Sequence, residues 1–180
     1  MGSEQSKDKM HCTRYINGTG PPTLADQVQN GANGTSKMNS KIVDGNQPDD
    51  GRMSIMHLSR NVEGYPKCDT IQINMEFEDG IQTENHPNPG QKYYGLKTVA
   101  FVPRNPEGIK VYRMLEVAFK HKLLFTVSTT STGEERVTFS DIPLKTKESG
   151  GHDSFSYPDP EYLKTVTKIL KSKGIKYTEK

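Results

Sequence analysis

The segment Gly80–Gly95 places the strongest constraint on how this chain can fold. Pro87 and Pro89 lack backbone N–H groups, and each holds the residue before it in an extended conformation. Gly90 leaves the backbone free to reverse its direction. The preceding residues, Ile71–Glu78, alternate apolar and polar side chains, as a strand with one buried face does. We therefore predict a buried strand followed by a stiff, irregular loop.

This loop is expected to expose His86, Tyr93 and Tyr94, after Asp79-Gly80 has turned the chain away from the strand. Loops that a rigid scaffold holds in place often carry binding residues, so an imidazole and two phenol rings presented outward indicate a recognition site. The alternative is that the loop is only an ordered connection between two strands. The residues of the loop leave both interpretations open.

Composition limits how much of the 180 residues can form a core, because hydrophobic residues make up only 31% and the mean hydropathy is −0.79. From Gln5 to Asn46 the chain is rich in Gly, Asn, Ser, Thr and Lys and has no apolar periodicity. Such a segment cannot bury enough apolar surface to offset the entropy lost on ordering. We therefore predict a disordered tail over residues 1–44 and a single domain over residues 45–180. The first residues expected to be buried are Met53, Ile55, Met56 and Leu58.

The N-terminal hexapeptide fits the acceptor pattern for N-myristoylation at Gly2. One myristoyl chain gives only marginal membrane affinity, and Cys12 is a candidate for palmitoylation as a second signal. The alternative is a chance match to a short pattern. With only two cysteines and no secretory signal, we expect a cytoplasmic chain, associated with a membrane surface if it is lipidated.

Charge and motif content exclude several classes of function. A net charge of +2 without a dense basic stripe argues against nucleic-acid binding. The five histidines and two cysteines are scattered singly, which excludes a zinc module of the RING type and leaves no expected metal site. We find no glycine-rich nucleotide loop and no nucleophile motif, and we assign no catalytic residue.

The rest of the chain alternates strands and helices. We expect a strand at Lys97–Val102, followed by a helix that Asn105 caps and Pro106 opens. The buried face of this helix should carry Ile109, Tyr112, Leu115 and Phe119, widened by Val111 and Ala118. Strands at Leu123–Ser128 and Arg136–Ser140 should form a hairpin that turns at Ser131–Glu134. A last helix should begin with Asp159 as its cap and Pro160 as its first residue, bury Leu163, Val166, Ile169 and Leu170, and end at Gly174. The fold class is α+β.

An ordered series of motifs runs through the predicted domain. It comprises Gly45-Asn46-Gln47-Pro48, Gly80-Ile81-Gln82-Thr83, His86-Pro87-Asn88-Pro89-Gly90, Phe101-Val102-Pro103 and Tyr157-Pro158-Asp159-Pro160. This series resembles the C-terminal domain of the Deltex family of ubiquitin ligases, and the resemblance extends from near Gly45 to Gly174. It implies a single α+β domain with a mixed sheet and packed helices, which in the family follows a RING.

The resemblance also implies a cleft that binds ADP-ribose and NAD. His86 matches the family's first ligand-contacting histidine. Val99 stands at the place of a second pocket histidine, and Arg113 at that of a helix glutamate implicated in ADP-ribosylating ubiquitin. We therefore expect ligand contacts from His86, Tyr93, Tyr94 and Arg113 and no catalytic group, because arginine cannot act as a base at physiological pH. No cofactor is required, and ADP-ribose or NAD is the expected ligand.

Three hypotheses for function follow from these patterns. The first is a non-catalytic module without a RING that acts in ubiquitin or ADP-ribose signalling by binding partners or a ligand. The second is a reader of ADP-ribose or NAD. The third is an enzyme, either an E3 ubiquitin ligase component that uses a RING supplied in trans, as in the family's Notch signalling, or an ADP-ribosyl transferase acting on ubiquitin. The partners implied are a RING-containing Deltex protein and ADP-ribosylated proteins.

Overall fold

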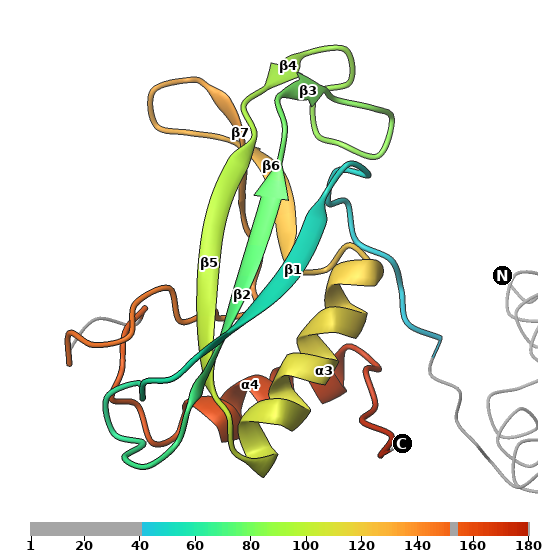
Figure 1. The fold of residues 1–180 in the computed structure, drawn as a ribbon. Coiled ribbons are helices and arrows are strands. Elements are labelled where there is room, and N and C mark those ends of the chain that lie inside the picture. Colours follow the sequence, from blue (N-terminus) through green and yellow to red (C-terminus); the bar gives the residue numbers. More distant parts are fainter. Residues whose placement is uncertain (1–40, 152–154, 180) are drawn as a thin grey trace, which may run out of the picture. The chain divides into compact units, whose positions relative to one another are not determined.

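Strand β2 (Thr70–Phe77) is the centre of a three-stranded antiparallel sheet, with β1 (Arg52–Leu58) on one side and β5 (Leu96–Pro103) on the other. Figure 1 shows this sheet in the computed structural model, which describes residues 41–151 and 155–179. The predicted alternation is confirmed, because the apolar residues of β2 are buried and the polar residues between them are only partly buried. The buried set is Ile71, Ile73, Met75 and Phe77.

The expectation that β1 is buried is wrong for half of its apolar residues. The exposed fraction is 39% for Ile55 and 52% for Met56, whereas Met53 and Leu58 are partly buried. The strand order explains this result, since β1 is the edge of its sheet and only β2 pairs with it. Apolar residues on an edge strand are covered from fewer sides than those of a central strand.

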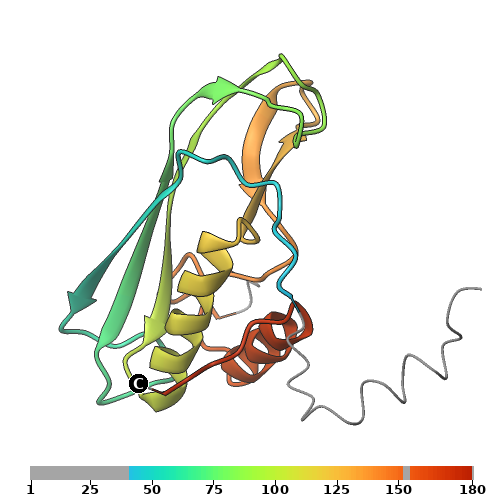
Figure 2. The same cartoon turned by 90° about the vertical axis from the view of Figure 1, so that its right-hand side faces the viewer.

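Helix α3 (Pro106–Lys120) lies along one face of the sheet (Figure 2). Its predicted start is confirmed: the side-chain oxygen of Asn105 accepts a hydrogen bond from Gly108 N at 2.7 Å, and Pro106 occupies the first turn. The predicted face was partly wrong, because Ile109 is 36% exposed. The buried residues of α3 are Gly108, Val111, Met114, Leu115 and Ala118, so the prediction is confirmed for Val111, Leu115 and Ala118.

Two further pairs of antiparallel strands are present in the described residues. β6 (Phe125–Thr129) and β7 (Glu135–Phe139) form the predicted hairpin, and Gly133 in its turn has a φ of 83°. β3 (Gly80–Ile81) pairs with β4 (Lys92–Tyr93), and one parallel bridge between Tyr94 and Arg136 gives the strand pairing its mixed character. The α+β class is thus confirmed.

Gly80 is not the turn residue that its sequence context predicts. It lies in β3 opposite Tyr93, and a Cβ atom placed on it would lie 2.4 Å from the Tyr93 hydroxyl oxygen. Glycine is needed at this position because the tyrosine ring approaches the backbone closely.

Helix α4 (Tyr162–Ser172) begins two residues later than expected. Asp159 Oδ1 accepts from Glu161 N at 3.2 Å, while Asp159 Oδ2 pairs with Lys145 at 2.8 Å, so the aspartate lies before the helix rather than at its cap. The predicted end is confirmed. Gly174 has a φ of 86°, and the N–H groups of Gly174 and Ile175 donate to the carbonyls of Lys171 and Leu170.

Some sequence predictions fall outside the described residues. The lipidation sites Gly2 and Cys12, and nearly all of the tail predicted at 1–44, belong to this group. Within residues 41–151 and 155–179, neither helix has the length and apolar character needed to cross a membrane. In the same ranges no three side chains of the metal-binding types converge on one point.

Candidate functional site around His86

The chain between β3 and β4 forms a loop that its own backbone closes. Gln82 N donates to Gln91 O at 2.8 Å, and Gly90 N donates back to Gln82 O at 2.8 Å. Inside this closure, His86 N donates to Thr83 O at 3.0 Å. The prolines of the loop need no acceptor, because they carry no N–H group. The loop is therefore ordered by hydrogen bonds at its two ends and by one at His86, the residue before Pro87.

Side chains attach the loop to the β6–β7 hairpin. Gln82, only 3% exposed, accepts from Asn88 N at 2.9 Å through Oε1 and donates to Glu135 Oε2 at 3.0 Å through Nε2. Asn88 Nδ2 donates to Glu135 Oε1 at 2.9 Å, and Thr129 Oγ1 donates to the same oxygen at 2.6 Å. One carboxylate on β7 thus receives bonds from the loop and from β6.

These bonds hold Glu135 in its ionised form. The hydroxyl of Thr129, followed by the amides of Gln82 and Asn88, lowers the pKa of the Glu135 carboxyl below its ordinary value. A charged acceptor forms shorter and stronger hydrogen bonds than a neutral one. The loop is therefore anchored best when this carboxyl is deprotonated.

His86 is positioned within the loop by a bond to one of its ring nitrogens. Its Nδ1 accepts from Thr83 N at 2.9 Å, and the Thr83 hydroxyl lies 3.3 Å from the same atom. The ring packs edge-on against Tyr93, with 6.1 Å between centroids and 62° between planes. In a neutral imidazole one nitrogen accepts and the other donates. Because the backbone N–H of Thr83 can only donate, the proton of neutral His86 lies on Nε2, which is left to donate to a ligand.

The expectation that Tyr93 is exposed is wrong. This side chain is only 7% exposed, since its ring lies over Gly80 and beside His86. Burial is the first cause that raises the pKa of the Tyr93 hydroxyl, followed by the charges of Asp50, Asp49 and Asp79. Tyr93 thus forms a buried wall beside His86.

Tyr94 is exposed, as expected, at 51%. Its backbone N–H donates to Glu135 O at 2.9 Å, and the Arg136 guanidinium lies 5.5 Å from the centre of its ring. Successive residues of an extended chain point to opposite faces. Tyr94 therefore presents a separate surface with Arg136, while Tyr93 lies with His86.

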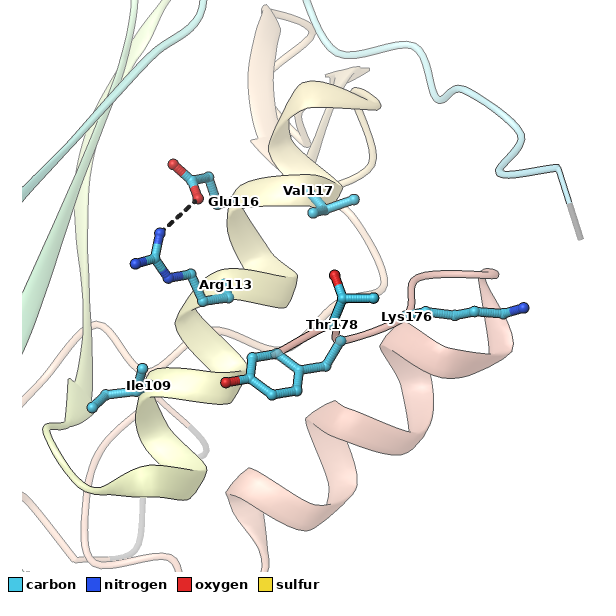
Figure 3. Close-up of a pocket in the computed structure, with 7 residues that line it drawn as sticks. Ile109, Arg113, Glu116, Val117, Lys176 and Thr178 are labelled. Atoms are coloured by element: carbon cyan, nitrogen blue, oxygen red, sulfur yellow. Dashed lines mark ion pairs between the residues drawn. The ribbon is translucent and has the colours of Figure 1, made fainter. Parts of the chain in front are cut away.

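Arg113 is not brought together with the loop. Its side chain is 61% exposed on α3, 3.7 Å from Glu116 and 5.5 Å from the ring of Tyr112. Arg113 is one of the residues that line a pocket of about 440 Å³ between α3 and Lys176–Thr178. Figure 3 shows its side chain directed toward Glu116. In the described ranges no hydrogen bond, ion pair or ring contact joins Arg113 to His86, Tyr93 or Tyr94.

Val99 lies on the opposite side of the sheet from α3. It is directly opposite Asn74 of β2, and Asn74 alternates with the buried residues that face the helix. Phe77 shows which face this is, because its ring contacts Phe119 of α3 with centroids 5.9 Å apart. Val99 and Arg113 therefore do not share one cleft.

Sequence reasoning missed the residues that brace the loop. Gln82 belongs to the motif Gly80-Ile81-Gln82-Thr83, but its role as a buried link between the loop and the hairpin depends on the fold. Glu135 and Arg136 follow a hairpin turn and carry no local signal, because their partners are as many as 53 positions away.

Comparisons with known proteins agree with the motif series. A family model described as the Deltex C-terminal domain matches residues 44–175. The Homo sapiens protein named "Probable E3 ubiquitin-protein ligase DTX3" is 38% identical over 178 residues, which cover 97% of this chain and 51% of that protein. The Homo sapiens "E3 ubiquitin-protein ligase DTX1" is 35% identical over 135 residues, or 73% of this chain and 22% of its own length.

A third relative, the Mus musculus "E3 ubiquitin-protein ligase DTX4", is 33% identical over 138 residues, which are 74% of this chain and 22% of that protein. The chain spans about half the length of the first of these relatives, 51% of DTX3, and less of the others. The family model covers well over half of the chain, between residues 44 and 175. This chain therefore belongs to the Deltex family, whose C-terminal domain it contains.

Proposed function

We propose that this chain acts in the ubiquitin pathway as a Deltex C-terminal module that binds ADP-ribose or NAD at His86 and performs no transfer chemistry by itself. The observation that supports it is the bond from Thr83 N to His86 Nδ1 at 2.9 Å. This bond fixes the ring orientation and leaves Nε2–H as a donor before any ligand arrives. Preorganised donors reduce the entropy lost on binding.

The residues around His86 fit such a ligand in part. The Nε2–H donor and the wall formed by Tyr93 suit the hydroxyl groups and the ring of a nucleoside. The negative charges of Asp49, Asp50 and Asp79, which after burial also raise the pKa of Tyr93, repel a pyrophosphate. Binding is therefore expected to be weak, with the phosphates away from these carboxylates.

Calorimetric titration with ADP-ribose and with NAD tests the proposal. His86→Ala should weaken binding by about two- to tenfold, which corresponds to one hydrogen bond to a neutral group of the ligand at ~0.5–1.5 kcal/mol. The matched control is His57→Ala, since His57 is an exposed histidine on β1. Equal affinity in both variants, or no heat and no amide shifts around His86 at saturating ligand, would reject the ligand-binding role.

A second candidate function is that of an E3 ubiquitin ligase component working with a RING supplied in trans, and the names of the relatives favour it. We expect no ubiquitin chains from the purified protein with activating enzyme, conjugating enzyme and ubiquitin alone. Chains that form only after a RING-containing Deltex protein is added support this candidate. ADP-ribosylation of ubiquitin is not expected in either mixture, because Arg113 stands where the family's glutamate is found.

A further inference from the structure

A groove between α3 and α4 concentrates positive charge. It has a volume of about 460 Å³, and its walls carry Lys110 from α3 and Lys164, Lys168 and Lys171 from α4. Glu107 is the acidic residue that lines it. We call this surface the lysine groove. The two helices pack against each other (Figure 2), so its walls are set by the fold rather than by loops.

The lysines on α4 lie on one stripe. Positions 164, 168 and 171 are spaced by four and three residues, which places them on the same helix face. The helix itself, Tyr162–Ser172, contains no carboxylate. Like charges at these spacings repel each other and destabilise a helix. This stripe therefore opposes the stability of the helix that carries it.

The helix dipole does not explain the stripe either. Cations are favourable near a helix C-terminus and unfavourable near its N-terminus. Lys171 is in the last turn, but Lys164 is in the first turn, at the positive end. Only one of the three α4 lysines is thus where helix stability alone would place it.

Neighbouring groups neutralise the stripe only in part. The Lys164 ammonium lies 3.7 Å from the Glu161 carboxylate, and the two side chains are 68% and 71% exposed, respectively. Lys110 lies 5.8 Å from the centre of the Tyr177 ring. Across residues 41–151 and 155–179, no ion pair includes Lys168 or Lys171. The groove therefore keeps a net positive charge that faces solvent.

We propose that the lysine groove docks an acidic segment of a partner protein. Four ammonium groups from two helices complement a run of carboxylates, and Pro160 adds an exposed apolar side chain to the lining of the groove. Among residues 41–151 and 155–179, no aromatic ring and no arginine line the groove, so this part of the chain gives it neither the stacking surfaces nor the forked donors of nucleic-acid sites. A recessed surface also fits an extended chain better than a flat membrane. This docking is separate from the ligand site at His86.

The test measures fluorescence polarisation of a fluorescein-labelled ten-residue peptide with six glutamates, at low and physiological salt. The full chain carrying Lys164→Glu and Lys168→Glu should bind the peptide at least tenfold more weakly than the unaltered chain. The control is Lys41→Glu with Lys120→Glu, two exposed lysines that form no ion pair in the described ranges. Both variants have the same net charge. Because Lys41 and Lys120 do not line the lysine groove, the control should lose less than twofold in affinity for the peptide.

Further arms separate the outcomes. Lys164→Gln with Lys168→Gln should show an intermediate loss and unfold at the same temperature as the unaltered chain, whereas His86→Ala should bind the peptide normally. An equal loss in both charge-reversed variants would mean that binding follows net charge and would overturn the proposal. It would also be overturned if oligothymidine or vesicles with 20% phosphatidylserine bound through Lys164 and Lys168 while the peptide did not bind.

Discussion

At the scale of single residues, the loop around His86 depends on a side chain that lies outside it. Glu135 accepts from Gln82, Asn88 and Thr129, and the first two of these belong to the loop. The orientation of His86 comes from Thr83, one residue after Gln82. The site is therefore positioned by a carboxylate that contacts no part of the imidazole in the described structure.

We expect Glu135→Gln to loosen the loop without unfolding the domain. A glutamine offers one acceptor oxygen and an NH₂ group that would face a donor, so the bonds to Gln82 and Asn88 cannot both be kept. Amide hydrogen exchange over residues 82–91 should become several-fold faster. Glu134→Gln is the control. The Glu134 carboxylate lies 3.4 Å from the exposed Arg136 side chain, and no described bond joins it to residues 82–91. Unchanged exchange in Glu135→Gln would show that the backbone bonds alone order the loop.

At the scale of elements, the start of α3 is held against the end of β5. A Cβ atom on Gly108 would lie 1.8 Å from the carbonyl oxygen of Pro103. The strand and the helix are separated by two residues, so neither can move far to make room. Glycine is thus required here by the close approach of two elements, although a helix interior ordinarily favours alanine.

Gly108→Ala is therefore predicted to destabilise the fold by about 1–3 kcal/mol, where an exposed helix position would gain about 1 kcal/mol from the same change. Urea denaturation measures the difference. Gly90→Ala provides the comparison: no atom lies within 4 Å of its added Cβ, and its φ of +86° leaves only the smaller cost of a strained backbone. A gain in stability for Gly108→Ala would contradict the contact with Pro103.

At the scale of the whole domain, stability should fall at low pH, because carboxylates that are paired in the folded state become protonated. Hydrogen bonding to Lys145 lowers the pKa of Asp159, and hydrogen bonding to Lys173 lowers that of Asp141. A group whose folded pKa is depressed adds stability at pH values above its ordinary pKa and loses it as the pH falls through the folded value. The ordinary values are 3.8 for aspartate and 4.5 for glutamate, so the free energy of unfolding should be level above about pH 4.5 and fall below it.

Asp159→Asn should remove part of this dependence. The Lys145 side chain is 3% exposed and Asp159 is 38% exposed, so water screens one partner of the pair. We expect the free energy of unfolding at pH 7 to fall by about 1–2 kcal/mol, in the lower part of the range for a hydrogen bond to a charged group. The free energy of unfolding of this variant should also differ less between pH 7 and pH 3 than that of the unaltered chain. Urea denaturation at both pH values tests this prediction. A variant as stable as the unaltered chain at pH 7 would show that the pair contributes nothing.

What the sequence alone determined is the local stereochemistry of this protein. The alternation of β2, the Asn105 cap, the hairpin turn at Gly133 and the end of α4 at Gly174 each depend on residues a few positions apart, and each is confirmed. The motif series also indicated the Deltex family correctly. These features are readable because φ angles, caps and side-chain periodicity are properties of short segments.

Only the tertiary structure decided which faces are covered and which residues meet. Ile109 is partly exposed because it lies beside the buried stripe of α3, and Ile55 is partly exposed because β1 is an edge strand. Neither fact can be read from the local sequence pattern. Likewise Tyr93 is buried while Tyr94 is exposed, and Glu135 reaches a loop 53 positions away. Burial and hydrogen-bond partners arise from contacts between distant segments, so they were fixed only when the strands and helices had packed together.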